Sequence, residues 1–202
     1  MASVVGHMMG AVVIWEAGRR LPGGWVPRGP WWYLVPAAVA VAPDLDTVVP
    51  IVVRSAHGMA HRGGSHSVLA AALIAACASA VVCLAHGPRS FFRVLPALFG
   101  CALMHPLLDY LMGCGPPVPF LWPFVRRGWL SPVQLVPTAH YARTAGGLLA
   151  LAVHPATWAG VGLEMLSLGP LWMAVRSAGI LRRALWLAGS TGGFLLTFLI
   201  YR

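Results

Sequence analysis

The sequence predicts an all-α polytopic membrane protein, built as a bundle of about five or six transmembrane helices. Hydrophobic residues make up 58% of the chain and charged residues only 9%, and the mean hydropathy is +0.76. Soluble domains contain roughly 25% charged residues. A soluble fold of this length would need far more charged surface, whereas a bilayer solvates apolar side chains directly. The third observation is that the apolar residues form long runs separated by arginines.

Six apolar runs are the candidate membrane segments. They cover Ala2–Ala17, Trp31–Val53, Ser67–Ala85, Val94–Met112, Thr157–Ala174 and Ala184–Tyr201. A spanning helix needs about 20 apolar residues, a length that the third, fourth and sixth runs approach. The first run is short, and prolines in the second predict a broken or re-entrant segment. We therefore expect a single integral membrane domain over residues 1–202.

The stretch that follows the fourth run differs in composition. Between Gly113 and about Arg143 it is rich in proline and glycine, so it is expected to be an irregular loop. The N-terminus lacks a basic region and its apolar run carries His7 and Glu16, which argues against a cleavable signal peptide. The four cysteines have no CxxC spacing and are interpreted as small buried hydrophobes.

The net charge of +9 arises from 14 arginines against five acidic residues, with no lysine. High genomic GC content and recognition of an anionic lipid or substrate both account for this preference. The arginines flank the apolar runs, where lipid headgroups lie. The basic character therefore indicates a membrane lipid or lipid-linked partner and no nucleic acid.

Acidic residues are scarce, and most of them lie inside apolar runs. An aspartate at a helix centre costs about 2.5–3.5 kcal/mol on insertion scales, so a buried carboxylate indicates a functional site with a partner. Asp44 and Asp46 follow Pro43, which disfavours helix at the preceding residue. Their spacing of two suits an extended stretch that lines a polar cavity. The alternative is a plain loop with solvated carboxylates.

Two further clusters contain histidine. His61 and His66 flank Arg62 in the heptad HRGGSHS, where Ser65 is the expected cap of the following helix. Imidazole is the commonest metal ligand in proteins and arginine suits an anion, although the heptad is equally consistent with an ordinary basic loop. In the fourth run His105 and Asp109 are four residues apart, so they share one helix face and can bind one cation or each other.

Alternation of six spans places all these residues in one half of the membrane. This set comprises His7, Asp44, Asp46, His61, His66, His105 and Asp109. Glu164 lies in the fifth run, at a depth of about 10 Å from the same side. Scattered structural residues would not be expected to converge, so the pattern predicts one site. Glu16 is expected to form a surface ion pair with the neighbouring arginines.

At these positions the sequence resembles a known family. The matching features are Gly6-His7, Trp31-Trp32 with Val35-Pro36, Pro43-Asp44-Leu45-Asp46, the HRGGSHS heptad, His105-xxx-Asp109, and Gly115, Val118-Pro119 and Leu121-Trp122-Pro123. The family is that of membrane-bound metal-dependent hydrolases, also described as LexA-binding, inner-membrane-associated hydrolases. The resemblance covers about the first 125 residues. It implies a multi-pass prokaryotic membrane protein with metal-dependent hydrolase activity, and it names no substrate.

We therefore expect a hydrolase with one or two divalent metal ions, Zn²⁺ first and Mn²⁺ or Fe²⁺ as alternatives. The seven His and Asp residues above exceed the four ligands of one tetrahedral site, which leaves a dinuclear centre open. Metal binding would make hydroxide from water at neutral pH, with Asp46 or Glu164 as general base. Arg62 and Trp122 are the expected substrate-binding residues. At headgroup depth, the expected substrate is lipidic and contains a phosphoester.

Two other functions remain open on the sequence. A divalent-metal transporter would use the same His/Asp cluster, but near the midplane and with access from both sides. The third is a non-catalytic scaffold with a structural metal. For sidedness, eight arginines are assigned to the face opposite the site, namely Arg19, Arg20, Arg28, Arg89, Arg93, Arg176, Arg182 and Arg183, and six to the site face. The positive-inside bias then predicts an extracytoplasmic site.

Overall fold

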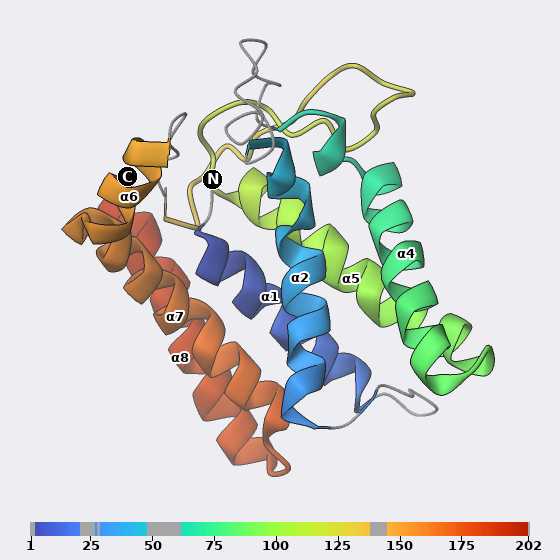
Figure 1. Cartoon of the computed structure of the whole chain (residues 1–202). Helices are drawn as coiled ribbons and strands as arrows, with labels where there is room; N and C mark the ends of the chain where they lie inside the picture. The colour runs from blue at the N-terminus through green and yellow to red at the C-terminus, as the bar shows by residue number, and fades with distance from the viewer. Residues whose placement is uncertain (1–2, 21–26, 28, 48–61, 138–144, 202) are drawn as a thin grey trace.

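The computed structural model describes residues 3–20, 27, 29–47, 62–137 and 145–201, and its regular elements are helices (Figure 1). The α-helices are α1 (Val4–Gly18), α2 (Leu34–Val41), α4 (Val68–His86), α5 (Arg89–Leu111), α6 (Ala145–Val153), α7 (Pro155–Arg176) and α8 (Ile180–Tyr201). Three short 3-10 turns are η1 (Pro30–Tyr33), η2 (Ala42–Asp44) and η3 (Gly64–His66). The predicted all-α bundle is confirmed.

Four of these helices are long and apolar enough to cross a membrane: α4, α5, α7 and α8, with 19, 23, 22 and 22 residues. The first predicted span is the 15-residue helix α1, which is shorter than the roughly 20 residues that a bilayer requires. The second predicted span is broken as expected, since α2 ends at Val41 and η2 contains Pro43. Residues 48–53 of that run lie outside the described residues.

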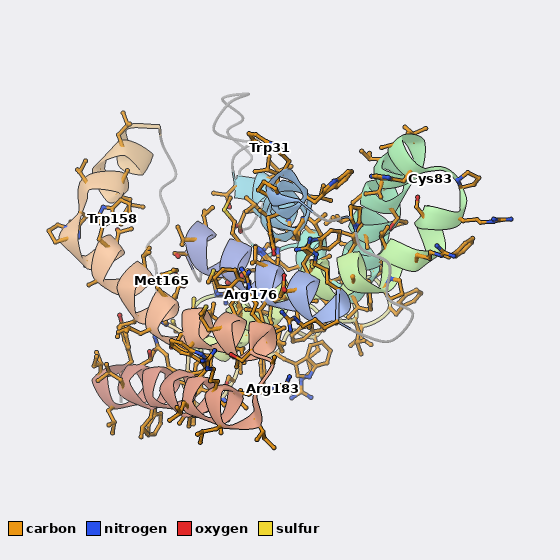
Figure 2. The ribbon with its side chains drawn as sticks, turned by 90° about the horizontal axis from the view of Figure 1, so that it is seen from below. Trp31, Cys83, Trp158, Met165, Arg176 and Arg183 are labelled. Carbon is orange, nitrogen blue, oxygen red and sulfur yellow. The ribbon has the colours of Figure 1, made fainter. Side chains whose placement is uncertain are left out.

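Helix α1 occupies the middle of the bundle (Figure 1). It packs against α2 and α5 on one side and against α7 on the other, while α4 packs on α5 and α8 on α7. Trp15 of α1 is fully buried in the core that it forms with α2, α4 and α5. The outer faces of α4 and α7 expose apolar side chains such as Leu84 and Trp158, the latter labelled at the edge of Figure 2, as expected of surfaces that contact lipid.

The segments that carry the predicted site meet at one end of the bundle. The start of α1, the end of α2, the start of α4 and the end of α5 lie together at the top of Figure 1. The connection from 113 to 137 runs over this end without helix, as its composition predicted. One prediction here is wrong, because the cap of α4 is Ser67, which accepts a hydrogen bond from the Ala70 amide, and not Ser65.

Candidate metal centre

Five buried residues from four segments bring their ligand atoms together at this end. They form two overlapping groups, His7, His105 and Asp109, and Asp44, His66 and His105. Within each group the ligand atoms lie within 4.8 Å of one another. All five residues are buried, with at most 4% exposure. The structure therefore places five of the seven predicted ligands in one cluster.

The two central imidazoles, His66 and His105, face each other through Nε2 at 3.0 Å. His105 Nδ1 lies 2.6 Å from the carbonyl oxygen of Ala40, which only accepts, so this nitrogen carries the proton. Ser65 Oγ donates its proton to Asp46 Oδ2 and lies 3.0 Å from His66 Nδ1. The hydroxyl therefore accepts from Nδ1, which gives His66 the same tautomer as His105.

Both Nε2 atoms then direct lone pairs at the same point. Such an arrangement is repulsive unless a proton or a cation lies between the nitrogens. Two nitrogen ligands of a tetrahedral zinc ion lie about 3.3 Å apart, from Zn–N distances of 2.0–2.1 Å. The observed 3.0 Å separation is close to this value. Burial also lowers the pKa of His66, which keeps its ring neutral at pH 7, the form that binds metal.

Two carboxylates flank the imidazole pair. Asp44 Oδ1 lies 3.4 Å from His105 Nε2 and 3.8 Å from His66 Nε2. Asp109 Oδ2 lies 3.4 Å from His66 Nε2 and 3.9 Å from His105 Nε2. The four side chains thus surround a common point with two nitrogen and two oxygen donors. Carboxylate oxygen and imidazole nitrogen are the donors found in catalytic zinc, manganese and iron sites.

His7 completes the cluster from α1. Its ring stacks on that of His105 with centroids 3.7 Å apart, and its Nε2 lies 3.7 Å from Asp109 Oδ1. Among the residues that the structure describes, neither ring nitrogen of His7 and neither carboxylate oxygen of Asp44 has a hydrogen-bond partner, although all four atoms are buried. Buried polar groups are normally hydrogen-bonded, so these four atoms fit a centre that binds a cation.

The number of ions is limited by His105, which belongs to both groups. Its Nδ1 is hydrogen-bonded to Ala40, so one nitrogen, Nε2, is left for a metal, and one nitrogen binds one ion. Within the described part of the chain, the two groups therefore share one metal position at His105 and form a single centre. A second ion would need the other oxygen of a shared carboxylate. His61, also predicted as a ligand, lies outside the described residues.

Asp46 lies beyond the ligand cluster. Its Oδ2 accepts a hydrogen bond from Ser65 and faces Nδ1 of His66, while its Oδ1 accepts from Thr47. A carboxylate on the far nitrogen of a ligating histidine fixes the tautomer and orientation of the ring. The structure thus gives Asp46 a positioning contact, whereas the sequence suggested a ligand or general base.

Arg62 is buried, with 4% exposure. Its Nε donates to Asp109 Oδ2 at 3.2 Å, and one terminal nitrogen donates to the carbonyl oxygens of Cys114 and Pro116. The backbone has φ = 66°, a left-handed conformation that an arginine rarely adopts. These contacts tie Asp109 to the loop after α5. They occupy the guanidinium that was expected to meet a substrate anion.

The remaining predicted residues lie farther from the cluster. Glu164 of α7 accepts hydrogen bonds from the amide and hydroxyl of Ser3, at the start of α1, and is outside both metal-binding groups. Trp122 is half-exposed, and its indole lies against Gly64 of η3, next to the cluster. Both remain predictions as catalytic and substrate-binding residues.

The family model described as "YdjM inner membrane protein" matches residues 1–194. The chain belongs to this family. Together with the four spanning helices, the match supports a location in the inner membrane. It confirms the inner-membrane part of the resemblance found in the sequence and carries no statement about hydrolysis or LexA. No curated protein and no solved structure matches the chain.

Proposed function

We propose that this protein is a membrane-embedded, metal-dependent hydrolase that cleaves a phosphoester in a lipidic substrate. The observation that carries the proposal is the pair of facing Nε2 atoms of His66 and His105, enclosed by Asp44 and Asp109. These four residues would hold a divalent cation, with His7 as a further ligand. A cation bound there would supply Lewis acidity and a water molecule of lowered pKa, the chemistry that hydrolysis needs.

The chain's own contribution is to fix the ligands before substrate binds. Asp46 holds the His66 ring through Nδ1, and the carbonyl of Ala40 holds the His105 ring in the same way. Arg62 holds the Asp109 carboxylate. Outer contacts of this kind typically contribute 10- to 100-fold in metal affinity or activity.

The loop beside η3 supports a lipidic substrate. Leu121, Trp122, Phe124 and Val125 are exposed, Phe124 to 83%, and the exposed Arg126 and Arg127 follow directly. Exposed aromatic and apolar residues followed by arginines, at the end of spanning helices, are typical of the membrane interface. In this proposal the loop rests among the headgroups, and its two arginines attract the phosphate of the substrate to the entrance of the site.

The position of the cluster favours a hydrolase over a divalent-metal transporter. A transporter holds its cation near the midplane with alternating access from both sides. Here the ligands come from the first turns of α1, the segment before α4 and the last turns of α5, all toward one end of the bundle (Figure 1).

The test is metal content and lipid hydrolysis by the purified full chain in detergent. Inductively coupled plasma mass spectrometry should find about one Zn, Mn or Fe per chain, most of it lost in His66→Ala and Asp109→Ala. His86→Ala is the matched control, because His86 is exposed at the far end of α4, and it should retain the metal.

The metal-loaded protein should release headgroup or phosphate from at least one of phosphatidic acid, phosphatidylglycerol and a polyprenyl phosphate. Release should stop on chelation and return with metal. If both cluster variants retained all of their metal, His66 and Asp109 would not be ligands and the proposed metal site would be wrong. If the metal-bound protein cleaved none of these lipids but carried the cation into proteoliposomes, the result would refute the hydrolase and support the divalent-metal transporter.

A further inference from the structure

A second concentration of charge lies at the opposite end of the bundle, away from the His/Asp cluster. It contains five arginines near the end of α1, the end of α7 and the start of α8, namely Arg19, Arg20, Arg176, Arg182 and Arg183. Figure 2 views this end from below and labels Arg176 and Arg183. Glu16 is the acidic residue there within the described ranges, and Arg19, Arg20 and Tyr33 all donate to it. The end is therefore strongly cationic.

A pocket opens between α1, α7 and α8 among these arginines. Its volume is about 330 Å³, and its lining includes Arg20 and Arg183 together with Leu171, Val175 and Leu187. With Ala17 and Ala174, two cations and five apolar residues thus line one cavity, a combination that neither a lipid-facing helix surface nor an ordinary aqueous loop requires.

The two guanidinium groups retain free donors. Arg20 uses Nε toward Glu16, and Arg183 uses one terminal nitrogen toward the carbonyl oxygen of Ser177. Their other guanidinium nitrogens make no hydrogen bond within the described part of the chain. Guanidinium groups with free paired donors bind phosphate oxygens in a bidentate manner, so the cavity offers two such contacts.

Two apolar residues of the lining, Leu171 and Leu187, lie deeper in the membrane than the arginines. Leu171 precedes the last residue of α7 by five positions, about 7.5 Å along the helix, and Leu187 follows Arg183 by four positions, about 6 Å. The charges thus lie at headgroup level and the apolar walls extend toward the hydrocarbon. A free phosphate ion would use the arginines and leave these walls without a function.

We propose that this pocket binds an anionic phospholipid. Its phosphate contacts Arg20 and Arg183, and its glycerol and first acyl carbons lie against Leu171, Val175 and Leu187. Such binding would link α1 to the α7–α8 hairpin from below. The inference is independent of the proposed hydrolase, because the pocket and the His/Asp cluster lie at opposite ends of the bundle.

The experiment measures lipid binding to the full chain by native mass spectrometry from detergent, with phosphatidylglycerol, phosphatidylcholine or inorganic phosphate added. The test variant is the double substitution Arg20→Gln with Arg183→Gln. The matched control is Arg89→Gln with Arg93→Gln, because these two exposed arginines lie in the first turns of α5, at the same end of the bundle but outside the pocket. Both variants lose two positive charges.

Wild-type protein should bind phosphatidylglycerol more tightly than phosphatidylcholine. The affinity should fall at least tenfold in the pocket variant, about what two lost phosphate contacts remove, and less than about twofold in the control. Equal losses in the two variants would show a diffuse charge effect and overturn the site. Unchanged binding in the pocket variant would also overturn it, as would inorganic phosphate that displaces the lipid at equal concentration.

Discussion

Helix α8 lies very close to the backbone of α7 at Gly193, and this contact allows a sharp test of the packing. A Cβ at this position would lie 2.6 Å from the carbonyl oxygen of Leu166 and 2.8 Å from the amide nitrogen of Ser167. These are backbone atoms of another helix, so no side-chain rotation relieves the overlap. At the adjacent Gly192 a Cβ would meet nothing within 4 Å.

The magnitude follows from these distances. Ordinary contact begins at 3.4 Å, so Gly193→Ala must separate the helices by about 0.8 Å. Overpacking of this kind costs about 1–3 kcal/mol. The shift also stretches the hydrogen bond from the Ser190 hydroxyl to the Ser167 carbonyl, which contributes about 1 kcal/mol. Alanine recovers about 1 kcal/mol of helix propensity, so the net destabilisation is about 1–3 kcal/mol. Gly192→Ala meets no steric overlap, so only the gain in helix propensity remains, and this variant should be stabilised by about 1 kcal/mol.

The measurement is the free energy of unfolding in detergent micelles, followed by tryptophan fluorescence, for the two variants and wild type. We expect shifts of opposite sign, separated by about 2–4 kcal/mol. Metal content should be unchanged in both, since α8 contributes no residue to the cluster. Equal shifts for the two neighbours would refute the close α7–α8 packing.

Three other substitutions test the surroundings of the cluster. Arg62→Met leaves the buried Asp109 carboxylate without its cation and should cost about 3–5 kcal/mol of unfolding free energy in chelator-treated protein, with a smaller cost once metal is restored. Gly64→Ala would place a Cβ 2.6 Å from the Trp122 ring, so it should speed amide hydrogen exchange in the 113–137 loop while metal is retained. Glu164→Ala should retain metal and cost about 1–3 kcal/mol at the start of α1; loss of hydrolysis with intact stability would instead support the predicted general base.

Hydropathy predicted the long helices because each of α4, α5, α7 and α8 is a continuous apolar run. Their ends were less predictable. Helix α5 begins at Arg89, five residues before the expected Val94, because the charged side chains at its start reach solvent while the backbone remains helical. Helix α6 was missed as a separate element because His154 and Pro155 divide one apolar run into two helices, where His154 caps the second.

The cluster was largely predictable because ionisable residues in apolar runs are costly, and their convergence followed from alternating spans. The contacts that hold the cluster residues in place could not be predicted. Arg62 donates to Asp109 and to the carbonyl oxygen of Cys114, 47 and 52 positions away in the chain, and no local pattern encodes such pairs. The different roles of Asp44 and Asp46 were equally hidden, because an extended stretch would place both side chains on one side. That prediction is wrong, since Asp44 ends the 3-10 turn η2 and Asp46 lies in the helical residues that follow. Only the position of His66 between them distinguishes the two carboxylates.

The central place of α1 has a consequence for biosynthesis. Its partner α7 begins 137 residues after α1 ends, so at about 5–20 residues per second the ribosome reaches it roughly 7–27 s later. Throughout that interval the amide and hydroxyl of Ser3 lack their hydrogen-bond acceptor, the carboxylate of Glu164. The face of α1 that will contact α7 meets lipid or the insertion machinery. The newly made chain therefore assembles its interior from both ends of the sequence, and a product truncated after α5 would carry His7 on a helix that is packed on one side only.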